Sequence, residues 1–264
     1  MLKVDIKELS ITGKRALLSG INFEMKQNRI HTVLGLNGSG KTTLIKSLTG
    51  LLNAHFYSVT GSVFFEGRDI LSLDINEMYP LRRDKIKYVF QDAVNSFNQL
   101  KTFEYYFNSL AKDKEEINSL LSYFILPQYS ELSRLYPYEV SGGMAQRISL
   151  VLALAAHPEI IILDEPTSGI DSAISNLFLL KLKEFVSQGK NSVLLVTHDI
   201  NFAEKISDEI AFLSDGRLSK FYSKKELFAY PDVPLSEGNN DKQDGPEGSD
   251  SLRKLIHSYK QISL

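Results

Sequence analysis

The sequence predicts an α/β fold built on a mostly parallel β-sheet, and two patterns lead to this prediction. Four short apolar runs have the composition of buried strands, and each is followed by polar or glycine-rich residues; they lie at 30–34, 85–90, 160–163 and 192–196. Helical patterns separate them, most clearly at 41–52 and 142–156. Strands that alternate with helices favour a parallel sheet, and such sheets bind ligands beyond the carboxyl ends of their strands. The four polar clusters are therefore expected to converge on one ligand.

Two further regions predict an antiparallel β subdomain and a helical subdomain. The first thirty residues and the segment 59–65 alternate between apolar and polar residues, as antiparallel strands do. A helical subdomain is expected at about 97–157, where the first forty residues are rich in Tyr and Phe. Residues 210–213 and 218–222, joined by Ser-Asp-Gly-Arg, predict a hairpin.

Composition excludes several classes of protein. The 264 residues are 43% hydrophobic and 23% charged, which is ordinary for a globular domain. A net charge of -2 gives no overall attraction to nucleic acid or anionic lipid. The chain has no cysteine, so a disulfide scaffold, a thiolate zinc site and a cysteine nucleophile are excluded. The longest apolar run, 150–156, is too short to span a bilayer, so any membrane role is expected to act through a partner.

The carboxyl-terminal segment divides into two predicted parts beyond a globular domain at 1–228. Residues 229–251 are interpreted as a disordered linker because 236–251 reads SEGNNDKQDGPEGSDS, which cannot build a core. Residues 252–264 are predicted to form an amphipathic helix, since apolar residues recur there at helical spacing. That helix would pack on its own domain, or dock on a partner or the membrane face.

A glycine-rich loop at residues 35–42, GLNGSGKT, matches the phosphate-binding pattern G-x-x-x-x-G-K-S/T. Its backbone N–H groups would point at phosphate oxygens, and the following helix would add its positive end. The alternative is a glycine-rich turn, but chance gives this pattern in roughly one chain of this length per hundred. A P-loop NTPase core of the RecA-like kind is therefore predicted, with ATP and Mg²⁺ as cofactors. The nucleotide-binding candidates in this loop are Gly35, Asn37, Gly38, Ser39, Gly40, Lys41, Thr42 and Thr43.

Asp164 and Glu165 follow the apolar run at 160–163. Asp164 would hold Mg²⁺ together with Thr42, and Glu165 would polarise the water that attacks the γ-phosphate. Taken alone, an Asp-Glu pair is also common at a solvated strand end. Gln91 and His198 each lie just past a predicted strand. Gln91 would contact Mg²⁺ or the attacking water and His198 the γ-phosphate, although an isolated Gln or His in that place is usually only a surface residue.

A second glycine-containing motif, VSGGMAQR at 140–147, precedes a long helical pattern. Ser141 is a good helix N-cap, and the bland interpretation is a capped helix. In order along the chain, GLNGSGKT, Gln91, VSGGM, IIILDEP, SGID at 168–171 and His198 together resemble the ATP-binding subunits of ABC transporters. The resemblance covers residues 1 to about 225. It implies that Ser141, Gly142 and Gly143 read the γ-phosphate bound by an opposite subunit, and that Asp171 crosses the interface of a head-to-tail dimer.

Finer features are similar to the peptide and nickel importer branch of that family. They are RLYPYEVSGGM at 134–144, with Met144 where most relatives carry Gln, and QDAVNSFN at 91–98. This branch implies import of peptides, nickel or metal chelates at the cytoplasmic face of the cell membrane. It also implies a second ATP-binding subunit that is a different chain, two permease subunits and an extracytoplasmic binding protein as partners.

Two departures and two alternatives accompany the resemblance. The family usually carries an aromatic residue near position 12 or 13 that stacks on adenine, whereas this chain has Thr12 and Gly13; its tail also lacks the branch's pattern. A regulator or assembly factor that uses the same ATPase without a permease is one alternative. A hydrolysis-dead partner is the other, and the presence of Lys41, Asp164, Glu165 and His198 argues against it.

Overall fold

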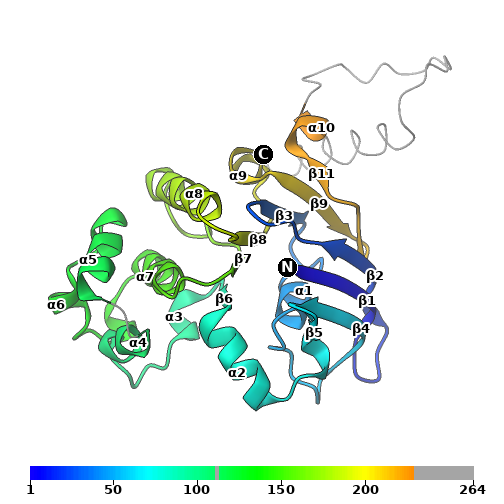
Figure 1. Cartoon of the computed structure of the whole chain (residues 1–264), viewed down its shortest axis with the longest axis horizontal. Helices are drawn as coiled ribbons and strands as arrows, with labels where there is room; N and C mark the ends of the chain where they lie inside the picture. Colours follow the sequence, from blue (N-terminus) through cyan, green and yellow to red (C-terminus); the bar gives the residue numbers. More distant parts are fainter. Residues whose placement is uncertain (111–112, 229–264) are drawn as a thin grey trace.

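The structure is a computed structural model that describes residues 1–110 and 113–228. Two sheets lie side by side, and a group of helices extends beyond one edge of the larger sheet (Figure 1). None of the helices in these two ranges is long and apolar enough to cross a membrane. The predicted linker at 229–251 and the predicted terminal helix at 252–264 lie outside the described residues.

The larger sheet is mostly parallel, which confirms the predicted α/β class. Its strand order is β10-β9-β3-β8-β7-β6, and β11 also pairs with β9. The strands from β9 to β6 are parallel, whereas β10 and β11 run antiparallel to β9. Their bounds are β3 Ile30–Gly35, β6 Ile86–Val89, β7 Ile160–Asp164, β8 Ser192–Thr197, β9 Glu209–Ser214, β10 Arg217–Leu218 and β11 Tyr222–Ser223.

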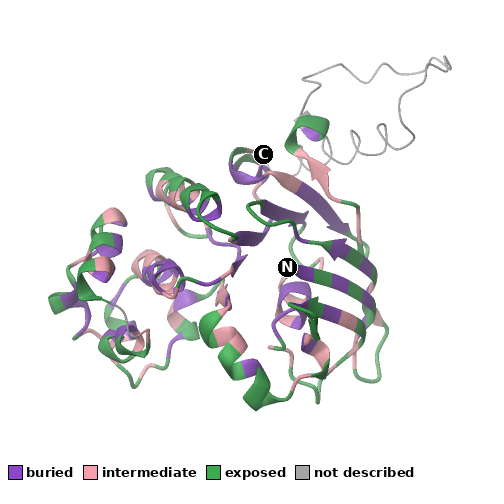
Figure 2. Cartoon of the chain, viewed as in Figure 1, coloured by how far each residue is buried: buried purple, intermediate pink, exposed green. Residues whose placement is uncertain are grey.

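The central strands β3, β7 and β8 are buried along their whole length (Figure 2). Successive side chains enter opposite hydrophobic clusters, as the two-residue period of a strand requires. Ile161 and Leu163 of β7 face the cluster shared with the helices, whereas Ile160 and Ile162 face the cluster shared with the antiparallel sheet. Apolar side chains on both faces make these runs continuous in the sequence, which is why they could be recognised there.

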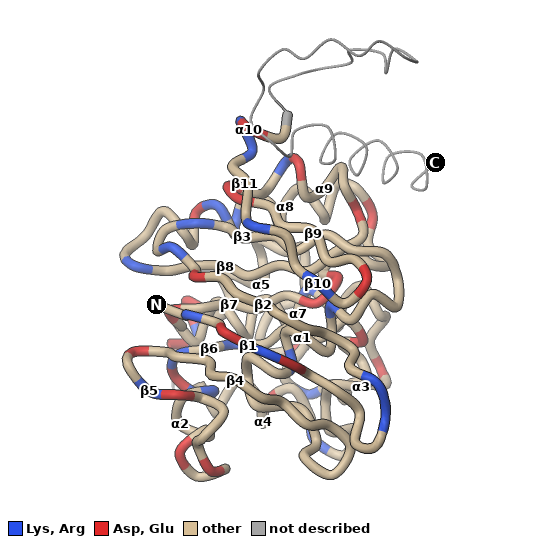
Figure 3. Tube along the Cα trace, turned by 90° about the vertical axis from the view of Figure 1, so that its right-hand side faces the viewer, with Lys and Arg blue, Asp and Glu red and all other residues tan. Residues whose placement is uncertain are grey.

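The smaller sheet is antiparallel with the order β2-β1-β4-β5. Its strands are β1 Leu2–Ile11, β2 Ala16–Glu24, β4 Tyr57–Phe65 and β5 Arg68–Asp69. Leu2, Val4 and Ile6 of β1 are fully buried, whereas Lys3 and Asp5 between them are exposed. Basic and acidic residues therefore alternate along the outer face of β1 (Figure 3). One buried and one solvated face explain the alternation seen in the sequence.

The hairpin predicted at 210–222 forms only in part. β9 pairs with the short β10 through Leu213 and Leu218, but Tyr222 belongs to a separate strand that pairs with Ile210 at the opposite end of β9. Between the two short strands, Ser219 bonds back to Phe212 and ends the first pairing. At the turn, Gly216 has φ +72°, and its carbonyl accepts from Ser19 N at 2.8 Å, which ties the two sheets together.

The α-helices cover both faces of the parallel sheet and extend beyond its β6 edge. α1 ends at Ser47, earlier than the predicted residue 52, because Gly50 takes φ +60° and Leu51 N donates to Lys46 O in a C-terminal cap. The bounds are α1 Lys41–Ser47, α2 Ile75–Asp84, α3 Ala93–Ser96, α4 Phe103–Ser109, α5 Lys114–Tyr123, α6 Tyr129–Leu132, α7 Gly142–Ala155, α8 Ser172–Ser187, α9 Ile200–Ile206 and α10 Lys224–Phe228, with 3₁₀ turns at Ile70–Ser72 and Pro137–Glu139.

Candidate nucleotide site

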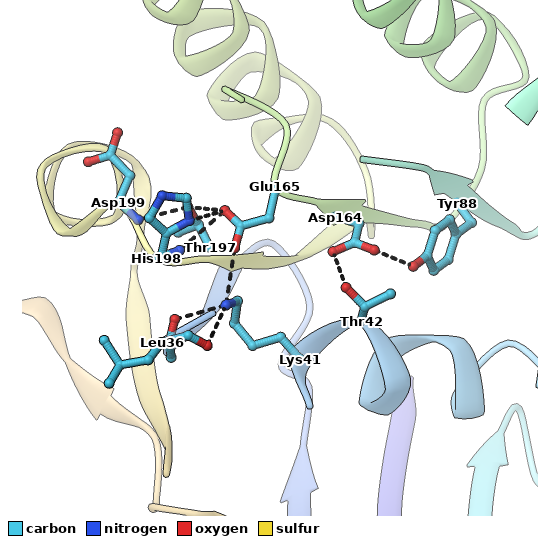
Figure 4. A network of polar contacts seen from close by, with 10 residues as sticks. Leu36, Lys41, Thr42, Tyr88, Asp164, Glu165, Thr197, His198 and Asp199 are labelled. Carbon is cyan, nitrogen blue, oxygen red and sulfur yellow. Dashed lines mark hydrogen bonds and ion pairs between the residues drawn. The ribbon is translucent and has the colours of Figure 1, made fainter. Parts of the chain in front are cut away.

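Residues at the carboxyl ends of four strands meet at one end of the parallel sheet, and Figure 4 shows the polar contacts of those at the ends of β3, β7 and β8. Gly35 ends β3, Gln91 follows β6, Asp164 ends β7 and His198 follows β8. A cavity of about 350 Å³ opens there, large enough for part of a small-molecule ligand. It is lined by Asn37, Gly38, Gly40, Lys41, Thr42, Thr43, Gln91 and Glu165.

The glycine-rich loop wraps around the side chain of Lys41. This lysine is 5% exposed, and its Nζ donates to the carbonyl oxygens of Gly35 at 2.8 Å and Leu36 at 3.1 Å. Gly38 and Gly40 have φ of +80° and +99°, which residues other than glycine rarely adopt. A Cβ on Gly35 would lie 2.5 Å from Ser39 Oγ. The tight loop therefore depends on its glycines, as the phosphate-binding interpretation requires.

Asp164 is buried at the end of β7, and each of its carboxylate oxygens accepts a hydrogen bond. Thr42 donates to Oδ1 at 3.0 Å and Tyr88 donates to Oδ2 at 2.9 Å. Burial raises the pKa of Asp164, and the two hydrogen bonds oppose that rise because they favour the charged carboxylate. Two of the three residues predicted to hold Mg²⁺, Thr42 and Asp164, are thus in direct contact, whereas the third, Gln91, lines the cavity and, among the described residues, makes no hydrogen bond to either of them.

Glu165 is held in a strained backbone conformation beside Lys41. Its φ is +46°, in the left-handed region that non-glycine residues rarely occupy, and its side chain is 5% exposed. One carboxylate oxygen lies 3.1 Å from Lys41 Nζ. The other accepts from Thr197 Oγ1 at 3.0 Å, from His198 N at 3.2 Å and from the His198 ring at 3.0 Å. Strain of this kind is characteristic of functional sites.

Gln91 and His198 lie at the open side of the site. Gln91 is exposed and lines the cavity with the phosphate loop. The His198 side chain is 51% exposed, and its Nδ1 is the ring atom that contacts Glu165. Because a carboxylate only accepts, Nδ1 carries the proton in this contact, and Nε2 makes no hydrogen bond to any residue that the structure describes. The next residue, Asp199, caps α9 by accepting from Phe202 N at 2.9 Å.

The second predicted phosphate-reading motif does not contact the phosphate loop of its own chain. Ser141 caps α7 by accepting from Met144 N at 3.2 Å, and Ser141 and Gly142 are exposed. Gly143 lies beside Gly169 and Ile170, directly before Asp171, whose carboxylate caps α8. Within the two described ranges, no hydrogen bond or ion pair joins residues 141–143 to residues 35–43.

Two polar contacts of this site were not expected from the sequence. Tyr88 donates to Asp164, the predicted metal ligand, and Thr197 donates to Glu165, the predicted base. Thr197 directly precedes His198 at the end of a strand, so its position in the sequence could have predicted that it joins the site. Tyr88 lies inside an apolar run and gave no such signal.

The region where the family's adenine-stacking residue is expected contains no ring at Thr12 or Gly13. Thr12 N donates to the carbonyl oxygen of Phe56 at 3.0 Å, which places Phe56 next to this loop. The Phe56 side chain is 62% exposed. It is therefore a candidate to replace the missing ring.

A wider depression of about 800 Å³ lies at the opposite end of the sheet, near the amino ends of β3 and β9. Arg29, Asp208, Glu209 and Lys224 are among its lining residues. It contains none of the predicted site residues, so the smaller cavity at the phosphate loop is the candidate site despite its size.

Comparisons with known proteins agree with this geometry. The profile of the family described as ABC transporter matches residues 18–168. The dipeptide transport ATP-binding protein DppD of Bacillus subtilis is 31% identical over 86% of this chain and 70% of its own length. The oligopeptide transport ATP-binding protein OppD of Escherichia coli is 29% identical over 89% of this chain and 74% of its own length.

Solved structures give the same result. The dimeric, post-hydrolysis structure of the ATP-binding cassette MJ0796 bound to ADP and Pi is 26% identical, with a TM-score of 0.73 over 85% of this chain and 99% of that one. The predicted resemblance and the predicted ATPase activity are thereby confirmed. Sequence profile, relatives, fold and phosphate loop together place this chain in the ABC transporter family, as an ATP-binding and ATP-hydrolysing subunit.

Proposed function

We propose that this chain hydrolyses ATP to power a peptide importer. The observation that carries the ATPase part is the convergence of Lys41, Asp164 and Glu165 at one cavity beside the phosphate loop. The peptide part is supported by the relatives, which are named as dipeptide and oligopeptide transport proteins. Nickel or a metal chelate is the other cargo that the sequence resemblance implies. No contact in the described ranges favours the alternative of a regulator without a permease.

Each residue of the site has a role that follows from its surroundings. When ATP binds, Lys41 would give up its ion pair with Glu165 and pair with the terminal phosphates instead. The Glu165 carboxylate would then be free to accept a proton from the attacking water. Thr197 and His198 hold that carboxylate from the other side, so it keeps its orientation during the exchange. Nε2 of His198 would then contact the γ-phosphate, and the amide of Gln91 would contact the water.

The site also fits Mg²⁺. Magnesium takes oxygen ligands and is usually bound through one or two carboxylates together with substrate phosphates. Thr42 and Asp164 offer a hydroxyl and a carboxylate in contact with each other beside the phosphate loop. The buried Ser39 Oγ has no hydrogen-bond partner among the described residues, so a phosphate oxygen could satisfy it. The metal, when bound, would neutralise phosphate charge.

The site requires residues from a second subunit. Ser141 and Gly142 are exposed, and Gly143 lies beside Gly169 and Ile170. No hydrogen bond or ion pair in the described ranges joins these three residues to their own phosphate loop, so they would not read the γ-phosphate bound there. A head-to-tail dimer would bring them to the site of the opposite subunit, and the similar cassette MJ0796 is dimeric in its post-hydrolysis structure. We propose a second ATP-binding subunit, two permease subunits and an external binding protein as partners, with this chain at the cytoplasmic face of the membrane.

Reconstitution tests this proposal. The purified chain alone should be largely monomeric and hydrolyse ATP slowly, with activity rising faster than linearly with its concentration. Addition of the second ATP-binding subunit and the permeases in vesicles should raise hydrolysis, and a peptide-loaded binding protein should raise it further. A Ser141→Arg variant should lose this stimulation while it still binds ATP. Full activity of the isolated monomer would contradict the dimer, and stimulation by nickel but not peptides would contradict the cargo.

A further inference from the structure

The Asp164 carboxylate is fixed from two sides, and only one of its two donors belongs to the phosphate-loop helix. Thr42 of α1 donates to Oδ1, and Tyr88 of β6 donates to Oδ2 (Figure 4). A carboxylate oxygen only accepts hydrogen bonds, so the Tyr88 hydroxyl is the donor. The direction of the hydrogen bond is therefore settled.

Strand register brings Tyr88 to Asp164. In the parallel pair β6–β7, Tyr88 lies opposite Ile162, and Asp164 is two residues further along β7. Residues two apart on a strand face the same side of the sheet. Tyr88 and Ile162 both pack against the cluster beneath the antiparallel sheet, so Asp164 and Tyr88 share that face. The phenol ring spans the remaining distance along the strand and reaches the carboxylate with its hydroxyl.

Tyr88 is itself held in place. Its ring is partly buried against that hydrophobic cluster, and the ring of Phe90 lies 4.5 Å away at a tilt of 48°. A carboxylate on its own turns easily about its last torsion, because that torsion has broad minima. A phenol that is packed in this way and bonded to one carboxylate oxygen restricts this rotation and keeps the other oxygen beside Thr42.

We propose that Tyr88 is a positioning residue for the metal: it orients Asp164 so that Oδ1 and the Thr42 hydroxyl face Mg²⁺ together. This inference rests on the proposed role of Asp164 as the carboxylate that holds Mg²⁺. Groups that orient metal-binding side chains typically change metal affinity by about 10–100-fold when they are removed. Tyr88 would affect the binding of Mg²⁺ and not that of the nucleotide, because Lys41 and the loop amides would contact the phosphates without it.

The test compares nucleotide binding with and without metal in the full chain. Affinity for the non-hydrolysable ATP analogue AMP-PNP is measured by calorimetry in EDTA and over a Mg²⁺ titration. Tyr88→Phe should raise the Mg²⁺ concentration for half-maximal tightening by about tenfold or more. Its affinity in EDTA should stay within about twofold of the unmodified chain. Tyr129→Phe is the matched control, since it also removes a buried tyrosine's hydrogen bond, to Asn108 at 3.2 Å, away from the site.

The variant Asp164→Asn distinguishes a failure of the metal site from a failure of the role of Tyr88. If this variant abolishes the Mg²⁺ dependence and Tyr88→Phe leaves it within twofold of normal, the role of Tyr88 is refuted while the metal site stands. If Asp164→Asn has no effect on the Mg²⁺ dependence, the proposed metal site itself fails. Equal losses for Tyr88→Phe in EDTA and in Mg²⁺, or a lowered melting temperature with no change in Mg²⁺ dependence, would show a structural role only and would also overturn the inference.

Discussion

The substitution Glu165→Gln should slow ATP hydrolysis and, at the same time, tighten ATP binding. The change removes the carboxylate that would accept a proton from water and keeps the size of the side chain. Loss of a general base typically costs about 10²–10⁴-fold in rate. Thr197 and His198 N can still donate to the amide oxygen, so the strained loop at 165 should keep its shape.

The structure also predicts tighter ATP binding for this variant. Lys41 Nζ is 3.1 Å from the Glu165 carboxylate, and both side chains are about 95% buried. A hydrogen bond to a charged group contributes about 1.5–3 kcal/mol net, and phosphate binding must replace this one. An amide pairs more weakly with the ammonium group, so the cost of the exchange falls. We expect ATP affinity to rise by about tenfold, which corresponds to ~1.4 kcal/mol.

Single-turnover hydrolysis in the reconstituted complex measures the first effect, and calorimetric titration of the isolated chain with ATP measures the second. Glu131→Gln, at an exposed position of α6, is the control for the chemical change alone. Hydrolysis within tenfold of the unmodified chain would refute Glu165 as the base. Weaker ATP binding would refute the proposed competition between Glu165 and the phosphates for Lys41.

Three further predictions follow from single residues. Lys41→Ala should weaken ATP binding itself, because it removes the positive charge at the centre of the phosphate loop. Calorimetry measures this effect, and an unchanged Kd would show that Lys41 only supports the shape of the loop. Thr12 and Gly13 cannot stack on adenine, so the affinity for ATP should exceed that for GTP by less than the two- to tenfold that stacking supplies. Thr12→Tyr should restore this preference for ATP. If the unmodified chain instead prefers ATP strongly and Phe56→Ala abolishes that preference, Phe56 is the stacking residue. Burial lowers the pKa of His31 from 6.5 to about 4, so the unfolded chain binds a proton more readily than the folded chain. Folding stability should therefore be complete above pH 6.5 and fall by about 2 kcal/mol between pH 7.5 and 5, with a smaller fall for His31→Gln in urea unfolding.

The sequence predicted the strands that are buried on both faces, because such strands consist largely of consecutive apolar residues. β3, β7 and β8 were recognised in this way, and their polar ends located Lys41, Asp164, Glu165 and His198 without any knowledge of the tertiary structure. Placement at one sheet edge then follows from parallel pairing alone.

Elements with weaker patterns were missed or misjudged. α2 was not predicted although Asp74 and Glu77 form a capping box at its start, because Pro80 lies inside it and only Met78 is buried. The predicted hairpin at 210–222 has a break at Ser219, where a side-chain hydroxyl rather than a turn sequence ends the pairing. α2 therefore lacks the buried apolar stripe that marks a helix in a sequence, and the break at Ser219 depends on a hydrogen bond that residue type alone does not specify.

Tyr88 shows the limit of sequence reasoning at the site itself. It stands in the run IKYVF, where an aromatic residue is expected to pack in the core, and its ring does so. Its hydroxyl acquires a function only because the register of β6 against β7 sets it two residues short of Asp164, within reach of a phenol but not of a shorter side chain. A shift of one residue in that register would turn the ring to the opposite face of the sheet and leave the Asp164 carboxylate oxygen without a donor. The site therefore depends on pairing between two strands as much as on the motifs at their ends, and that pairing is a property of the folded chain.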